Sequence, residues 1–247
     1  MKYLLLTFLL FSFQLGVAQM DTINTNSAKL RLPADHKIRN FYAVYFTDSL
    51  GNPTKTPDLW DRELKIEKGA DGKSVLHFTW RAYRHDSLAL EANGICQLPS
   101  LKPIEYITFN RLRQKRSVRY QDNKVMVEGK SRKTQRDTTY SVTINIPAFV
   151  FPMDLEIFTL LPLKKKGQQF AIPFYEPASP TASYYKCEVL GKEDLKVAED
   201  TVIPCWLLKL NYSEKAHALF WISISTQELL KVKQPTNTGY RYKIRLF

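Results

Sequence analysis

The residues that most often perform catalysis do not form a catalytic pattern in this chain. Of the four histidines, only His36 and His85 have a carboxylate neighbour, in Asp35-His36 and His85-Asp86. Adjacent residues on a strand point to opposite faces, so neither pair predicts an oriented dyad. The sequence has no Gly-x-Ser-x-Gly motif, no phosphate-binding glycine loop and no cysteine and histidine spacing typical of a metal site. We therefore expect no enzymatic activity, no catalytic residues, no metal and no cofactor.

Aromatic side chains are the candidates for contact with a ligand. The segments 205–208 (Cys-Trp-Leu-Leu) and 219–222 (Leu-Phe-Trp-Ile) are apolar at consecutive positions, so both faces of these strands should be covered. One face meets the core, and the other meets a helix, a loop or a ligand in a hydrophobic cleft. The alternative is that the tryptophans are core residues. The candidate ligand contacts are Trp80, Trp206, Trp221, Phe149 and Phe151.

Positive charge is concentrated in one segment. The formal net charge is +12, and residues 111–136 contain ten basic and two acidic side chains. One interpretation is contact with an anionic partner, such as the inner leaflet of the outer membrane or an envelope polysaccharide. The other is a solvated hairpin that keeps the protein soluble and protects a sheet edge. Nucleic acid is not expected as a partner of an exported protein. The candidate contact residues are Arg111, Arg113, Lys115, Arg116, Arg119, Arg132 and Lys133.

The first eighteen residues have the order of a secretory signal peptide. Lys2 supplies a positive charge, residues 4–13 are almost entirely apolar, and Gly16-Val17-Ala18 places small residues before a cleavage site at Gln19. No later segment approaches the ~18 apolar residues of a transmembrane helix. We therefore expect export to the periplasm, with secretion as the alternative.

An exported protein meets an oxidising compartment, where disulfides persist. The chain has three cysteines, Cys96, Cys187 and Cys205. Cys187 and Cys205 fall on neighbouring predicted strands and are the candidate pair. The alternative is that all three are small buried hydrophobic residues.

Alternation of apolar and polar residues predicts a mainly β protein. After the signal peptide, residues 19–59 form a polar N-terminal segment with one strand, and residues 60–247 form the β domain. Residues 154–160 predict a single short helix, which Pro162 ends. Six strands after Pro180 predict an antiparallel meander. The predicted strands are 41–47, 60–67, 76–82, 104–110, 118–121, 124–128, 140–146, 168–175, 183–190, 193–198, 202–211, 217–224, 228–234 and 240–247.

The second half of the chain also resembles a known family. The resemblance is carried by Asp154-Leu155-Glu156, Leu160-Leu161-Pro162-Leu163-Lys164, the segment 185–193, the segment 205–210, Phe220-Trp221-Ile222-Ser223, Leu229-Leu230-Lys231-Val232 and Gly239-Tyr240-Arg241-Tyr242. Together these segments are similar to an exported family of Gram-negative bacteria described only as a domain of unknown function, and the similarity extends over about residues 60–247.

In fold, that family resembles the periplasmic lipoprotein carrier and its outer-membrane receptor. The resemblance implies a single curved antiparallel sheet that forms an unclosed barrel around a short helix and loops. It also implies a location in the cell envelope. The function that we expect is non-enzymatic binding of a hydrophobic or acylated ligand, such as a lipid. The alternative is an envelope interaction module that binds a protein or an anionic polysaccharide through its basic surface, without a ligand cavity.

Overall fold

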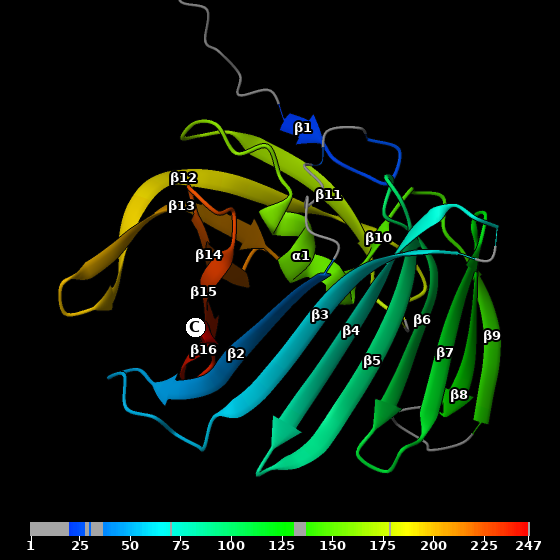
Figure 1. Ribbon diagram of the computed structural model, residues 1–247, viewed down its shortest axis with the longest axis horizontal. Helices are drawn as coiled ribbons and strands as arrows, with labels where there is room; N and C mark the ends of the chain where they lie inside the picture. Colours follow the sequence, from blue (N-terminus) through cyan, green and yellow to red (C-terminus); the bar gives the residue numbers. More distant parts are fainter. Residues whose placement is uncertain are drawn as a thin grey trace, which may run out of the picture.

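The computed structural model describes residues 20–27, 30, 37–69, 71–130, 137–177 and 179–246. The predicted signal peptide and two of the predicted contact residues, Arg132 and Lys133, lie outside these ranges. Within them, a single 16-stranded sheet winds around one short helix, α1 (Asp154–Thr159). Figure 1 shows α1 with the strands β12 to β16 on one side of it and the strands β2 to β9 on the other.

The sheet is an antiparallel meander that does not close into a barrel. Along the sheet the order is β1, β11 to β16, and then β2 to β9, with β10 beside β11. Only β1 and β10 pair in parallel, both with β11, and no ladder among the described residues joins β9 to β1. The strands are β1 (Met20–Thr22), β2 (Lys37–Asp48), β3 (Asp58–Lys68), β4 (Ser74–Arg84), β5 (Ser87–Gln97), β6 (Lys102–Asn110), β7 (Lys115–Gln121), β8 (Lys124–Lys130), β9 (Asp137–Thr143), β10 (Phe149–Val150), β11 (Gln169–Tyr175), β12 (Ser183–Ala198), β13 (Thr201–Asn211), β14 (His217–Ser223), β15 (Leu229–Thr236) and β16 (Gly239–Leu246).

The N-terminal segment belongs to the same sheet as the rest of the chain. The strand predicted at 41–47 is present and longer, as β2, and it lies between β16 and β3. Because β16, the last strand of the chain, pairs with β2, strands from the C-terminal and N-terminal parts of the chain meet in the middle of the sheet. This pairing places β16 next to β2 and one strand away from β3, and the site described below depends on it.

Two strand predictions were wrong in detail, and three strands were missed: the long β5 and the short β1 and β10. The segments 183–190 and 193–198 form one strand, β12, because the register shifts at Gly191 without breaking the strand. Gly191 has a φ of +146°, which glycine adopts readily and which suits a β-bulge. The predicted strand 140–146 ends at Thr143. Strand β5 was not predicted because its Ala, Glu, Asn and Gly residues have low β propensity.

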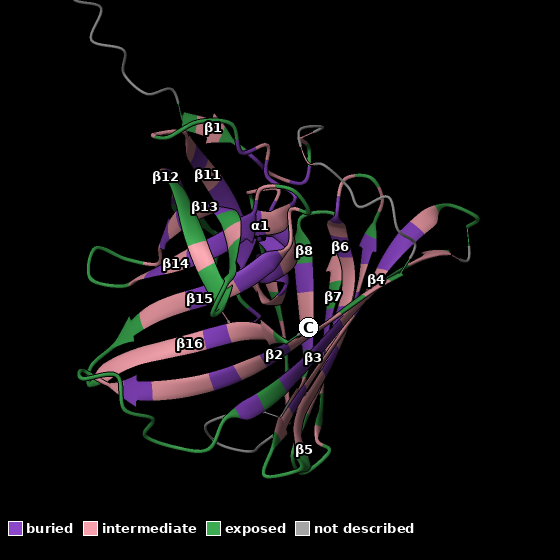
Figure 2. Cartoon of the chain, turned by 60° about the vertical axis from the view of Figure 1, so that its left-hand side comes forward, coloured by how far each residue is buried: buried purple, intermediate pink, exposed green. Residues whose placement is uncertain are grey.

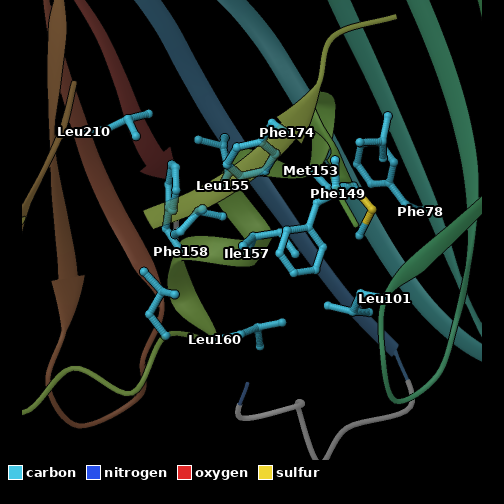
Figure 3. Packing of buried hydrophobic residues seen from close by; sticks show 14 of the residues in the cluster. Phe78, Leu101, Phe149, Met153, Leu155, Ile157, Phe158, Leu160, Phe174 and Leu210 are labelled. Atoms are coloured by element: carbon cyan, nitrogen blue, oxygen red, sulfur yellow. The ribbon is translucent and has the colours of Figure 1, made fainter. Parts of the chain in front are cut away.

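Helix α1 occupies the space enclosed by the sheet. It follows a short 3-10 turn, η1 (Phe151–Met153), and it ends just before Pro162, as predicted. Ile157 and Phe158 are fully buried. Figure 3 shows the helix side chains between Leu210 on one side and Phe78 and Leu101 on the other. The helix is too short to be stable alone, so this packing must hold it in place.

The sheet therefore has an inner face, turned toward α1, and an outer face. Figure 2 shows buried residues alternating with more exposed ones along many strands, as a sheet with one covered face requires. The doubly apolar strands β13 and β14 contribute to two clusters. Leu208, Leu210 and Phe220 join the main inner core. The smaller outer cluster consists of Cys205, Trp221 and Leu230, with Leu195, Ile203, Leu207 and Leu219 packed against it.

Candidate functional site

A cavity of about 460 Å³ lies on the inner face of the sheet, beside the start of α1. Its walls come from β3 to β6, from η1 and α1, and from β15 and β16, which are distant in sequence. A second cavity, of about 400 Å³, lies near the end of β9 and is lined by polar and apolar residues in similar proportion. The first cavity combines aromatic and cationic side chains. It is lined by Trp60, Arg62, Trp80, Leu90, Tyr106, Thr108, Phe151, Pro152, Asp154, Glu176, Tyr212, Gln234, Arg241 and Lys243.

The aromatic part of the wall is built from strands and from the turn before the helix. Trp60 on β3 and Trp80 on β4 contact each other, with ring centroids 4.7 Å apart. Phe151, in the turn η1, also lines the cavity, and its ring centroid is 6.1 Å from that of Tyr212. Trp80 and Phe151 were predicted as ligand contacts, and the structure places both of them in this cavity.

Arg62 joins the wall of the cavity to the helix. It is 3% exposed, and its guanidinium donates two hydrogen bonds to the Glu156 carboxylate, at 2.7 and 2.5 Å. A third hydrogen bond, of 2.6 Å, goes to the carbonyl oxygen of Pro152. Burial alone would lower the pKa of Arg62, but the Glu156 carboxylate outweighs burial and the pKa is raised. The charge of Arg62 is therefore fully partnered and its role is structural.

Strand β16 turns its two cations, Arg241 and Lys243, toward the inner cavity. Tyr240 and Tyr242 point to the outer face, where Tyr242 stacks on Tyr45 at 5.2 Å, and Arg241 and Lys243 line the inner cavity. A sheet normally turns its charged residues to water. In β16 this arrangement is reversed, because the inner face carries the charges and the outer face carries the aromatic rings.

Lys243 is a buried cation without an acidic partner. It is 7% exposed, and among the described residues its ammonium has neither a hydrogen bond nor an ion pair. The ammonium lies over the ring of Trp60, with Nζ 4.9 Å from the ring centroid. Burial lowers the pKa of Lys243 to about 8, with Arg241 and Arg62 adding to the effect and Asp154 opposing it.

Arg241 shares the same aromatic ring. Its guanidinium carbon lies 5.1 Å from the Trp60 ring centroid, and its buried Nε has no hydrogen-bond partner. Burial also lowers the pKa of Arg241, against the attraction of Asp154. A further unpartnered donor lies in the same wall, because the buried Nε1 of Trp80 has no acceptor. The wall of the cavity therefore contains two cations and a buried tryptophan N–H without an acceptor.

The other predicted aromatic contacts lie elsewhere. Phe149 is 1% exposed in the main core, 6.0 Å from the ring of Phe174. Trp206 packs against the same core, with the Lys192 ammonium 5.0 Å from its ring. Trp221 belongs to the outer cluster, and its Nε1 donates a 2.9 Å hydrogen bond to Glu193. The structure thus brings Trp80 and Phe151 together and separates them from these three.

The described part of the basic segment, residues 111–130, forms the β6–β7 turn, β7 and β8, and several of its charges are partnered. Arg113 forms a 2.8 Å ion pair with Glu91. Arg119 lies 3.4 Å from Glu105 and 3.9 Å from Glu128. Arg116 donates to the hydroxyl of Tyr140 at 3.1 Å. The remaining described candidates, Arg111 and Lys115, are exposed.

The predicted disulfide between Cys187 and Cys205 is wrong. All three cysteines are free and buried. Cys187 is opposite Leu210 in the β12–β13 ladder, five residues along β13 from Cys205, which corresponds to roughly 17 Å of strand. Cys187 also belongs to the inner core and Cys205 to the outer cluster. A disulfide needs Cα atoms within about 7 Å, so no bridge can form.

The missed residues of the site are Trp60, Arg62, Arg241 and Lys243. The alternation of aromatic and basic residues in β16 was visible in the sequence and was the available signal. It defines two faces without indicating which one is turned inward.

The fold and the cavity define a class of protein: an unclosed antiparallel sheet wound around a short helix, with a cationic and aromatic cavity on its inner face. The chain belongs to the family described as "Protein of unknown function (DUF3108)", whose model matches residues 54–245. A solved structure similar to it is a β-barrel-like protein of the domain of unknown function DUF1849 from Brucella abortus. The two share 10% identity over 88% of this chain and 97% of that chain, with a TM-score of 0.46. Among curated proteins, no match was found.

No helix within the described ranges is long and apolar enough to cross a bilayer.

Proposed function

We propose that this protein is a non-enzymatic binding protein of the cell envelope that holds the hydrophobic part of a lipid or an acylated ligand in its inner cavity. The observation that carries the proposal is the cavity between α1 and the sheet, about 460 Å³ in volume, with walls of Trp60, Trp80, Phe151 and Tyr212. Ligand sites in proteins typically have volumes of about 300–1,000 Å³ and mostly apolar walls with a few placed polar groups.

The aromatic walls supply the favourable part of the binding free energy. Burial of one methylene group contributes about 0.8 kcal/mol, so ten methylenes contribute about 8 kcal/mol. Association itself costs several kcal/mol in lost freedom, so a long chain is needed for useful affinity. These magnitudes favour an acyl chain over a small metabolite.

The envelope location is part of the proposal. It is supported by the charged start, the apolar run and the small residues before Gln19. It is also supported by the family resemblance carried by the second half of the chain. Anionic lipids of the outer membrane's inner leaflet would then be within reach of the protein.

A direct test is native mass spectrometry, with solvent extraction, of the mature protein purified from a bacterial periplasm. A co-purifying lipid or acyl species is the expected result. Recovery of the protein without its leader, in the periplasmic fraction, tests the export claim in the same preparation.

A matched pair of variants tests the cavity itself. Trp80→Leu changes the cavity wall, and Trp221→Leu makes the same change in the outer cluster. We expect Trp80→Leu to weaken binding of a fluorescent fatty acid by about tenfold, as loss of a buried aromatic contact would. Trp221→Leu should bind as wild type does. Equal binding by both variants, with wild-type circular dichroism, contradicts the cavity assignment.

The alternative function is docking to an anionic partner through the basic surface. The exposed Arg111 and Lys115 favour it, whereas the ion pairs of Arg113 and Arg119 weaken it. Its signature is binding to anionic vesicles that disappears in high salt, because exposed charges are screened. That result, combined with no binding of a fluorescent fatty acid, favours the alternative.

A further inference from the structure

We propose that Arg241 and Lys243 form a recognition subsite for a singly charged acidic head group, either a carboxylate or a phosphodiester. This inference rests on the proposed function, since it assigns the end of the cavity that receives the ligand's head. The apolar body of the ligand would lie against the aromatic wall, and the head would be bound by the two cations of β16.

The first argument is the contrast between the cations of the cavity. Arg62 has a carboxylate and a carbonyl as partners, whereas Lys243 and the Nε of Arg241 have no acceptor among the described residues. Burial of a charge without a partner is strongly unfavourable. An acidic group that enters the cavity would supply the missing partner for both.

The second argument is preorganisation. The guanidinium of Arg241 and the ammonium of Lys243 lie 5.1 and 4.9 Å from the centroid of the same ring, that of Trp60. They are two residues apart on one strand and therefore share a face. Cation–π contact holds both charges in place before a ligand arrives, so less conformational freedom is lost on binding. The buried Trp80 Nε1, which lacks an acceptor, adds a neutral donor to this wall.

The third argument is the balance of charged side chains around Lys243, which indicates that the ligand's head group carries a single negative charge. The inner groups are the cations Arg62, Arg241 and Lys243 and the anions Asp154 and Glu156. Glu156 is paired with Arg62. Asp154 forms no ion pair with either cation of β16, and the Oδ1 of Asp154 accepts a 2.8 Å hydrogen bond from the Leu155 N–H. Glu176 is exposed to solvent in the cavity wall. Among Lys243 and the inner groups around it, one positive charge is thus in excess, and a monoanion balances it; the exposed Glu176 is not one of these groups.

Lys243 links this subsite to pH. The charged groups that face it are Arg62 from β3, Asp154 and Glu156 from α1, and Arg241 from its own strand. A bound anion favours the protonated ammonium, so it raises the pKa of Lys243 from about 8. At pH 8.5 the binding of an acidic ligand should therefore take up protons from the buffer, and the affinity should fall as the pH rises further.

The test compares ligands that share one chain and differ in the head. The probes are dodecanoate, 1-dodecanoyl-lysophosphatidylglycerol and dodecanol, titrated into the delipidated mature protein by calorimetry at pH 7. We expect at least one acid to bind about tenfold or more tightly than the alcohol, because charge-assisted hydrogen bonds are stronger than neutral ones. Preference for dodecanoate identifies a carboxylate head, and preference for the lysolipid identifies a phosphodiester.

The variants are Lys243→Met and Lys233→Met, which remove one lysine each from the inner and outer faces. Lys233 lies on the outer face, 4.0 Å from the Tyr240 ring centroid, and serves as the control. We expect Lys243→Met to lose most of the preference for the acid while its affinity for dodecanol stays unchanged. Lys233→Met should bind all three probes as wild type does.

Distinct results overturn the two proposals. If wild type binds dodecanol and the acids equally, the subsite is refuted and the hydrophobic cavity stands. If none of the three probes binds, the proposed function itself is refuted. Should Lys243→Met not fold, wild type still tests the subsite through proton uptake, measured at pH 8.5 in buffers of different ionisation enthalpy. No uptake with a bound acid contradicts the role of Lys243.

Discussion

Replacement of Lys243 by methionine should make the protein more stable. The substitution exchanges a buried ammonium for an apolar side chain of similar length, at a position that is 7% exposed. Burial lowers the pKa of Lys243 from 10.5 to about 8. Each pKa unit corresponds to about 1.4 kcal/mol, so the protonated form disfavours the folded state by about 3 kcal/mol at pH 7. Lys243→Met removes this term.

The same reasoning fixes the pH dependence of the effect. Between pH 8 and 10.5 the unfolded chain keeps a proton on Lys243 that the folded protein has released, so the stability of the wild type rises with pH in this window. The advantage of the variant therefore shrinks, from about 3 kcal/mol at pH 7 to about 2 at pH 9 and about 1 at pH 10. Other groups also titrate there, for example Cys96, whose pKa is raised to about 12 by burial. Their contributions cancel in the difference between variant and wild type.

The assay is equilibrium urea unfolding of the delipidated mature protein, its Lys243→Met variant and the Lys233→Met control at pH 7, 9 and 10. The m-value should be the same for all three, because the surface exposed on unfolding hardly changes. The control should differ from wild type by less than about 0.5 kcal/mol, as surface substitutions usually do. A Lys243→Met variant that is no more stable than wild type at pH 7 refutes the reasoning. A gain that does not change with pH refutes it as well, and either result removes the support for an unpartnered cation in the cavity.

Three further predictions concern the scaffold. Glu156→Gln leaves the buried Arg62 without its counter-charge and should lower the free energy of unfolding by about 3 kcal/mol; a loss below about 1 kcal/mol in urea unfolding contradicts the role of the pair. Gly239→Ala places a Cβ against the Thr47 carbonyl oxygen and should destabilise by about 2 kcal/mol or more, whereas Gly72→Ala, which shares the positive φ but has open space around its Cβ, should cost less in the same thermal melt. The three cysteine thiols should react with Ellman's reagent only after unfolding, and recovery of a single thiol from the unreduced, unfolded protein would show that a disulfide exists after all.

Local patterns in the sequence predicted much of the fold. Alternation predicted most of the strands, and the short helix at 154–160 is present as α1. Strand β5 was not predicted, because its inner positions include Ala92 and Gly94, which are small residues with low strand propensity. Their size matters in the tertiary structure, since a Cβ on Gly94 would lie 3.3 Å from the Phe78 ring. Strand β12 was divided in two because Gly191 interrupts its alternation.

The candidate site was predicted less well, for a reason that Trp80 and Trp221 illustrate. Both are tryptophans in apolar strands, yet Trp80 lines the inner cavity and Trp221 lies in the outer cluster. A side chain's face depends on the register of its strand against every neighbour, and a shift of one residue exchanges the two faces. The register is a property of the whole sheet and cannot be obtained from one strand.

The sequence by itself determined the β class, the positions of most strands and the single helix, because these depend on residues within a few positions of one another. Only the tertiary structure decided that Arg241 and Lys243 point inward and that the tyrosines between and beside them point outward. That choice follows from the pairing of β16 with β2, which joins residues 239–246 to residues 41–48 and completes the continuous sheet around α1. Contacts between residues this far apart in sequence depend on the packing of the entire chain, so no local pattern contains them.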